Sequence, residues 1–126
     1  MELDKIHALV VDDSSTMVRI VSNTLKRVGI ETITTGADGV LGLEAFMNTP
    51  GINLILTDIN MPNMNGMELL IAIRKLNKDI PIVMITTEGG KVDVIKALKA
   101  GCNSYIIKPF TPDVLKEKLK AILEKS

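Results

Sequence analysis

The sequence predicts an α/β protein built on a five-stranded parallel sheet that is covered by helices on both faces. Apolar segments of strand length alternate five times with segments whose apolar residues recur at helical spacing. Several strand-like segments are apolar throughout, which is typical of parallel strands that are buried on both faces. The expected strands are 6–11, 31–35, 52–57, 80–87 and 103–108.

The segments between these strands carry helix signals of different strength. Residues 15–28 repeat apolar side chains at helical spacing, and a glycine follows as a stop. Residues 38–48 form a weaker pattern, because each of two glycines costs a helix about 1 kcal/mol relative to alanine. The last helix begins at the pair Thr111-Pro112, a capping hydroxyl followed by a proline in the first turn. Two further helices each have an apolar side: 66–77 with Leu70 and Ile71, and 91–100 with Ile95 and Leu98.

The order of the strands follows from their number and direction. Right-handed crossovers leave few topologies, and the common doubly wound order for five parallel strands is 2-1-3-4-5, the flavodoxin-like (βα)5 arrangement. The sequence has no repeat, low-complexity segment or linker, so we expect a single domain over residues 1–126. In such a sheet, ligands bind beyond the carboxyl ends of the strands where the order reverses, between the first and third strands.

Composition narrows the classes of function. Formal net charge is zero, with 15 basic and 15 acidic residues, which argues against nucleic-acid binding. The charges are uneven, because residues 1–63 hold 8 acids and 4 bases whereas residues 64–126 hold 7 acids and 11 bases. An acidic patch and a basic surface are therefore expected. No apolar run approaches the roughly 18 residues of a membrane span, and a single cysteine fits a reducing compartment, so we expect a cytoplasmic protein that does not bind membranes.

Polar side chains follow the predicted strands at the edge where the order reverses. Asp12 and Asp13 end the first strand, and Asp58 ends the third. Like-charge repulsion makes it unfavourable for three clustered carboxylates to be ionised at once, so a divalent cation is expected. Ligands that are all oxygen atoms favour Mg²⁺ or Mn²⁺. Thr86 and Lys108 end the fourth and fifth strands at the same edge. A metal, a lysine and a hydroxyl would stabilise a phosphoryl group on the most central carboxylate, so Asp58 is the candidate nucleophile.

Together these residues resemble the receiver domain of two-component response regulators. The resemblance covers the whole chain and includes the acid pair 12–13, the segment 58–62, Gly66, Thr86 and the pair Lys108-Pro109. The stretches DDSSTM, ITTEGG and YIIKPFTP are similar to single-domain chemotaxis members of that family. The resemblance implies a phosphorylation-controlled interaction module rather than an enzyme with a small-molecule substrate. A chemotaxis-type histidine kinase would donate the phosphoryl group, the flagellar motor switch would bind the phosphorylated state, and a phosphatase could assist.

The resemblance also implies roles for residues around the metal. Asp13 would bind Mg²⁺ directly and Asp12 would act through water. The Asp58 carboxylate and the backbone carbonyl of Asn60 would be the remaining protein ligands. Lys108 would contact the phosphoryl oxygens.

Other residues would carry the response to phosphorylation. Thr86 would move to hydrogen-bond the phosphate, and Tyr105 would turn inward to fill the vacated space, although Tyr105 taken alone would be a half-buried aromatic of the sheet. Asn60 and Glu88 would tune how readily water reaches the acyl phosphate. The Lys108–Pro109 peptide bond would be cis, as proline allows.

Lysines of the second half form the candidate partner surface. They could be no more than solvated helix faces, which is the default interpretation of such charges. The sharper hypothesis is a basic face that suits an acidic segment of a partner bound by a monomer. The residues of this face are Lys91, Lys96, Lys99, Tyr105 and Lys118.

The sequence also bears on three other functions. A phosphate-shuttling receiver in a phosphorelay would carry the same site. An enzyme that turns over through an aspartyl phosphate would need a second acid two residues after Asp58, where this chain has Asn60. A flavin carrier on the same fold would need a phosphate-binding loop after the first strand, where Asp12 and Asp13 would instead repel a phosphate.

Overall fold

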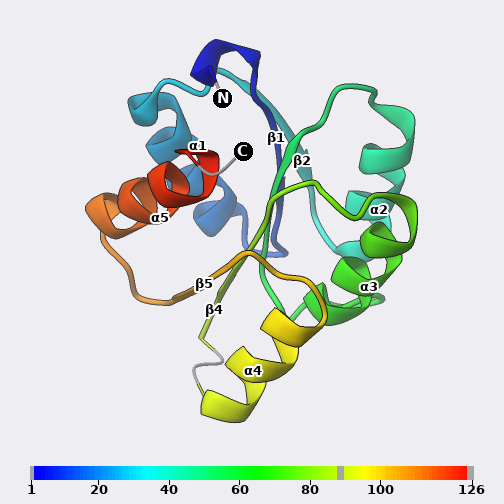
Figure 1. Cartoon of the computed structure of the whole chain (residues 1–126). Helices are drawn as coiled ribbons and strands as arrows, with labels where there is room; N and C mark the ends of the chain where they lie inside the picture. The colour runs from blue at the N-terminus through cyan, green and yellow to red at the C-terminus, as the bar shows by residue number, and fades with distance from the viewer. Residues whose placement is uncertain (1, 88–89, 125–126) are drawn as a thin grey trace.

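The computed structural model of the chain describes residues 2–87 and 90–124, and within these the side chains of residues 91 and 92 are not described. Five strands make one sheet: His7–Val11 (β1), Thr32–Gly36 (β2), Leu54–Thr57 (β3), Ile82–Thr86 (β4) and Ser104–Ile107 (β5). All neighbouring strands are parallel, and their order is β2-β1-β3-β4-β5 (Figure 1). The predicted fold class and strand order are confirmed.

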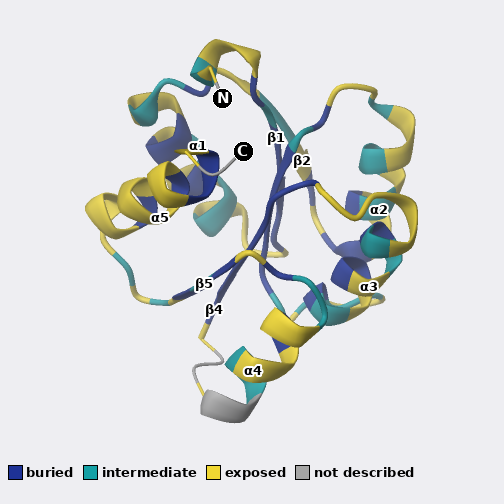
Figure 2. Ribbon diagram, viewed as in Figure 1, coloured by how far each residue is buried: buried dark blue, intermediate teal, exposed yellow. Residues whose placement is uncertain are grey.

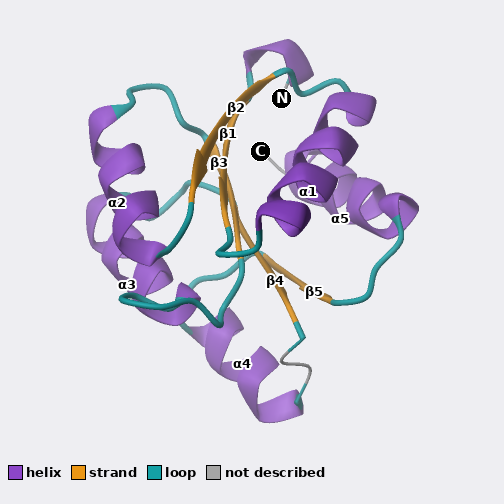
Figure 3. Ribbon diagram, turned by 180° about the vertical axis from the view of Figure 1, so that it is seen from behind, coloured by secondary structure: helices purple, strands orange, loops and turns teal. Residues whose placement is uncertain are grey.

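Helices connect the strands and cover both faces of the sheet. They are Leu3–Lys5 (η1, a short 3-10 helix), Ser15–Val28 (α1), Gly39–Asn48 (α2), Gly66–Leu76 (α3), Lys91–Lys99 (α4) and Pro112–Glu124 (α5). Helices α1 and α5 lie on one face, whereas α2, α3 and α4 lie on the other (Figure 3). The predicted helices agree with the observed ones to within one or two residues at most ends. Only η1 had no counterpart in the prediction.

The sheet separates two hydrophobic cores, and strands β3 and β4 are buried along their whole length (Figure 2). Successive residues of a strand point to opposite faces. Accordingly, Val10 and Leu56 pack into the core beneath α1 and α5, while Leu9 and Ile55 pack into the core beneath α2, α3 and α4. This two-sided burial is the physical reason for the continuously apolar strands in the sequence.

Two helices turn a different side toward the sheet than the apolar pattern suggested. Ile71 of α3 is 47% exposed, and Ile95 and Leu98 of α4 are 40% and 48% exposed. In α4 the small side chain of Ala97 is buried instead. A broad apolar arc can meet the sheet along either edge, so helical periodicity alone does not say which residues within it are covered.

Other backbone features bear on the site. The Lys108–Pro109 peptide bond is cis, as expected. Asn63, in the loop between β3 and α3, adopts a left-handed conformation with φ of 67°. Within residues 2–87 and 90–124, no helix is long and apolar enough to cross a membrane.

Candidate functional site

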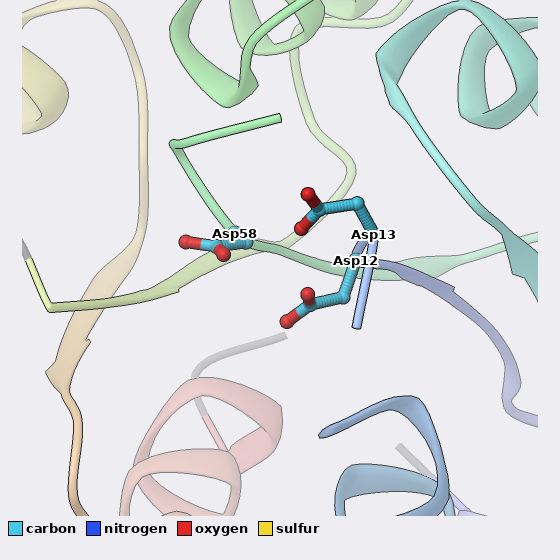
Figure 4. A group of neighbouring side chains, drawn as sticks. All are labelled: Asp12, Asp13 and Asp58. Carbon is cyan, nitrogen blue, oxygen red and sulfur yellow. The ribbon is translucent and has the colours of Figure 1, made fainter. Parts of the chain in front are cut away.

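The sheet brings three carboxylates together at the carboxyl ends of β1 and β3. Asp12 and Asp13 follow β1, and Asp58 follows β3. The backbone N–H of Asp58 donates to the carbonyl of Val11 over 3.0 Å, which keeps the two strand ends in register. Figure 4 shows Asp12 and Asp13 extending from the end of β1 toward Asp58, and one oxygen of each carboxylate lies within 4.8 Å of the others.

Lys108 joins this cluster from the end of β5. Its Nζ lies 3.0 Å from Oδ2 of Asp12 and 3.3 Å from Oδ2 of Asp58. The Lys108 side chain is 12% exposed, and the residues Asp12 and Asp58 are 5% and 8% exposed. Charges shielded from water in this way interact more strongly than an exposed pair. Lys108 therefore offsets the repulsion between two of the three carboxylates.

The hydrogen bonds of Asp12 occupy both of its carboxylate oxygens. Oδ1 accepts from the backbone N–H of Ser14 over 2.9 Å, and Oδ2 accepts from Lys108. Burial raises the pKa of Asp12 above its usual value, while the bonds from Ser14 and Lys108 oppose that rise. An ionised Asp12 is thus held in place by a backbone donor and an ammonium group.

Asp13 and Asp58 differ from Asp12 in what surrounds them. Asp13 is exposed, and no residue of the described part of the chain makes a hydrogen bond or ion pair with its side chain. Oδ1 of Asp58 accepts from the backbone N–H of Ile59 over 2.7 Å, and Oδ2 faces Lys108. Of the three carboxylates, Asp13 retains the most oxygen lone pairs for a cation.

Two further predicted residues lie on neighbouring strands at this edge. Thr86 ends β4 and is fully buried, and Tyr105 of β5 is half-buried opposite Met84 of β4. The backbone N–H of Lys108 donates to the carbonyl of Thr86 over 2.8 Å, which ties the ends of β4 and β5 together. Exposed Asn60 lies in the loop between β3 and α3. Glu88 lies outside the described residues.

The candidate partner face contains more than the predicted lysines. Lys96 and Lys99 of α4 and Lys118 of α5 are exposed, whereas the side chain of Lys91 is not described. Exposed apolar side chains lie on the same elements: Ile95 and Leu98 on α4, and Ile107 on β5. The surface of α4 and β5 therefore combines positive charge with apolar area, and the apolar part was not predicted from the sequence.

Asp38 and Asn63 lie near the site but were not among the residues predicted from the sequence. Asp38 precedes α2 and is 8% exposed, and its Oδ2 accepts a hydrogen bond from Nδ2 of Asn63 over 2.8 Å. An aspartate before a helical pattern is a recognisable N-cap signal. Its bond to Asn63 spans 25 residues of sequence and leaves no local signal.

Comparison with known proteins identifies the family. The family described as "response regulator receiver domain" matches residues 8–120. This chain belongs to the response regulator receiver domain family. Receiver domains bind Mg²⁺ at an acidic pocket of the kind that Asp12, Asp13 and Asp58 form here. They are signalling proteins rather than enzymes in the ordinary sense.

Relatives within the family are chemotaxis proteins. Over 117 residues the chain is 56% identical to chemotaxis protein CheY1 of Helicobacter pylori, which covers 91% of this chain and 94% of that protein. It is 53% identical over 117 residues to the CheY homolog of Campylobacter jejuni, covering 91% of this chain and 90% of that protein. The chain is therefore a CheY-like chemotaxis response regulator.

Solved structures agree with this assignment. CheY4 of Vibrio cholerae aligns with a TM-score of 0.84 and 33% identity, covering 93% of this chain and 98% of that one. A chain of the CheX–CheY–BeF3–Mg²⁺ complex of Borrelia burgdorferi aligns with a TM-score of 0.89 and 27% identity, covering 94% and 89%. Flavodoxin and CheY are both standard examples of the strand order 2-1-3-4-5.

Proposed function

We propose that this chain acts as a single receiver domain that accepts a phosphoryl group on Asp58 from a chemotaxis-type histidine kinase. The observation that carries the proposal is the meeting of Asp12, Asp13, Asp58 and Lys108 at one edge of the sheet. The identity of 53–56% to CheY proteins supports the chemotactic context.

The donor set suits Mg²⁺, which prefers oxygen ligands and retains several waters. Asp13 and Asp58 would bind the ion directly, together with the backbone carbonyl of Asn60. Asp12 would act through water, as the resemblance to other receiver domains implies, and its bonds from Ser14 and Lys108 would hold its carboxylate beside the ion. Mn²⁺ shares the preference for oxygen and would substitute. When bound, the ion supplies positive charge that offsets the charge of the carboxylates and of the phosphoryl oxygens.

Phosphoryl transfer then depends mainly on positioning of the reacting groups and on positive charge that stabilises the phosphoryl oxygens. A carboxylate oxygen of Asp58 attacks the phosphorus of a phosphohistidine, the P–N bond breaks, and the imidazole keeps the electron pair of that bond and takes up a proton. Lys108 lies within 3.3 Å of the Asp58 carboxylate, where its ammonium would contact the phosphoryl oxygens. Water later attacks the phosphorus, which restores Asp58 and releases phosphate. The chain would thus catalyse only its own phosphorylation and dephosphorylation, with Asn60 and Glu88 tuning the access of water.

The phosphoryl group would act as a switch. It adds close to two negative charges and three acceptor oxygens. Buried Thr86 is a neighbouring hydroxyl that could turn to meet them, and half-buried Tyr105 would follow into the space vacated. The change would strengthen binding at the face formed by Lys91, Lys96, Lys99, Tyr105 and Lys118. We propose that its partner there is the flagellar motor switch, bound by a monomer in the cytoplasm, and that a phosphatase assists in ending the signal.

A mass measurement tests the central step. The protein is incubated with Mg²⁺ and acetyl phosphate, and its intact mass is recorded. Wild type should gain one phosphoryl group, and Asp58→Asn should gain none. Asp113→Asn, which changes an exposed aspartate at the start of α5, is the matched control and should behave as wild type. A wild type that gains no mass, or an Asp58→Asn variant that gains it, would overturn the proposal.

A further inference from the structure

The loop between β3 and α3 carries Asn60, the proposed backbone ligand of the cation. The sheet positions Asp58 at the start of this loop, and the backbone N–H of Gly66 closes it by donating to the carbonyl of Ile59 over 2.8 Å. Between these points Asn60, Pro62 and Asn63 are all exposed. The loop has one backbone bond of its own, donated by Met64 to the carbonyl of Pro62 over 2.7 Å. Contacts with another part of the chain restrict its path further.

Those contacts come from the start of α2. Oδ1 of Asp38 accepts from the backbone N–H of Leu41 over 2.8 Å and so caps the helix. Its second oxygen, Oδ2, accepts from Nδ2 of Asn63 over 2.8 Å. The backbone N–H of Gly39 donates to the carbonyl of Met64 over 3.1 Å.

Close backbone approach accompanies these bonds. A Cβ at Gly39 would collide with the carbonyl oxygen of Met64, so the two loops meet there without room for a side chain. The left-handed conformation of Asn63 lets its amide reach Asp38, and asparagine adopts this conformation more readily than most residues. The bonds from Leu41 and Asn63 hold the pKa of Asp38 below its usual value, so the carboxylate is ionised and the bond to Asn63 is charge-assisted.

The location of this contact relates it to the site. Strands β2 and β3 flank β1, so the loops that follow β2 and β3 lie on either side of the end of β1. The Asp38–Asn63 bond joins these two loops directly. It is therefore placed to fix the second loop relative to the carboxylates at the end of β1.

We propose that Asp38 and Asn63 form a positioning pair that holds the β3–α3 loop in the conformation in which the backbone carbonyl of Asn60 can reach the cation. This inference rests on the proposed role of Mg²⁺ at the three carboxylates. Neither side chain touches the cation. Each acts by reducing the freedom of the loop before the cation binds, so that less conformational entropy is lost on binding.

Two variants separate this role from helix capping. Asn63→Gly keeps access to the left-handed conformation and removes the amide. Asp38→Ser keeps a capping oxygen for α2 but is too short to accept from Asn63. Mg²⁺ affinity of the intact protein is measured by isothermal titration calorimetry, well below the unfolding temperature of each variant. We expect each variant to bind Mg²⁺ about tenfold more weakly than wild type, and the double variant to bind no more weakly than either single one.

Phosphorylation by acetyl phosphate gives a second readout. The Mg²⁺ concentration for half-maximal rate should rise in both variants, while the rate at saturating Mg²⁺ stays near that of wild type. A general loss of structure would lower the saturated rate as well. Asp113→Ser, in the first turn of α5, should leave Mg²⁺ affinity unchanged.

The outcomes distinguish the inference from the function on which it rests. If Asp13→Asn loses Mg²⁺ binding but Asn63→Gly binds Mg²⁺ as tightly as wild type does, the proposed positioning role is wrong and the proposed function stands. If the losses of Mg²⁺ affinity in the two single variants add up in the double variant, the residues act separately and the proposal that they act as a pair is also wrong. If wild type binds no Mg²⁺, the proposed metal site fails and the inference fails with it.

Discussion

Replacing Lys108 by methionine removes the only ammonium group that contacts the carboxylate cluster among the described residues. The change deletes two ion pairs, of 3.0 Å to Asp12 and 3.3 Å to Asp58, while keeping an unbranched apolar side chain. Both carboxylates keep a backbone donor, from Ser14 and from Ile59, but lose their positive partner.

The size of the effect follows from burial. Each pair at about 3 Å corresponds to a gross attraction of about 5 kcal/mol at an effective dielectric constant of about 20, much of it offset by the desolvation of the lysine. Breaking a buried pair by removing one partner typically costs about 3–5 kcal/mol. Because the Lys108 side chain is 12% exposed, solvent screening is limited. We expect the free energy of unfolding at neutral pH without Mg²⁺ to fall by about 3 kcal/mol.

The loss should depend on pH with a defined sign. Burial already raises the pKa of Asp12, and Lys108 opposes that rise, so the pKa rises further in the variant. At pH values between the pKa of Asp12 in the unfolded state and its higher pKa in the folded state, the native state binds more protons than the unfolded state. Lowering the pH through this range therefore stabilises the variant. The stability gap between wild type and variant should therefore narrow as the pH falls from neutral toward the usual range of an aspartate.

Urea unfolding followed by circular dichroism measures the effect, with and without Mg²⁺. The cation should recover more stability in the variant than in wild type, because no ammonium competes for the carboxylates. At a concentration of about 100 times its dissociation constant it would contribute about 2.7 kcal/mol. Lys118→Met, an exposed change on α5, is the control and should alter stability by less than about 0.5 kcal/mol. A Lys108→Met variant that is as stable as this control would refute the reasoning. So would a variant whose loss in the free energy of unfolding changes with neither pH nor Mg²⁺ concentration.

Three further changes probe the loop, the switch and the partner face. A Cβ in Gly66→Ala would overlap the backbone carbonyl of Asp58, the proposed phosphoacceptor. We therefore expect the free energy of unfolding in urea to fall by about 2 kcal/mol and phosphorylation to slow. In the control Gly90→Ala the new Cβ meets only a flexible side chain, so neither stability nor phosphorylation should change. Thr86→Ala should still be phosphorylated at a normal rate by intact mass, but phosphorylation should raise its affinity for a partner less than in wild type. A phosphorylation-dependent gain equal to that of wild type would exclude Thr86 from the switch. Charge reversal in Lys96→Glu with Lys118→Glu should weaken binding of an acidic partner segment in a titration and leave phosphorylation unchanged, and unaltered affinity would exclude the basic face.

The fold and most of the acidic site follow from short-range signals. Strand and helix periods are local properties of the sequence, and right-handed crossovers then leave few arrangements of five parallel strands. Carboxylates that end the first and third strands must meet once that order is adopted, which is why the sequence alone predicts that Asp12, Asp13 and Asp58 lie together. Lys108 could be added because it ends the fifth strand at the same edge.

Tertiary structure alone decided which side chains are covered and which distant loops meet. Ile95 and Leu98 are exposed because α4 meets the sheet through Ala97, a matter of helix orientation that periodicity does not encode. The neighbours Asp12 and Asp13 differ in exposure because successive side chains leave the end of β1 in different directions. The hydrogen bond that Asn63 donates to Asp38 depends on the packing of two loops, because the two residues are 25 positions apart and neither has a local sequence signal that indicates the other.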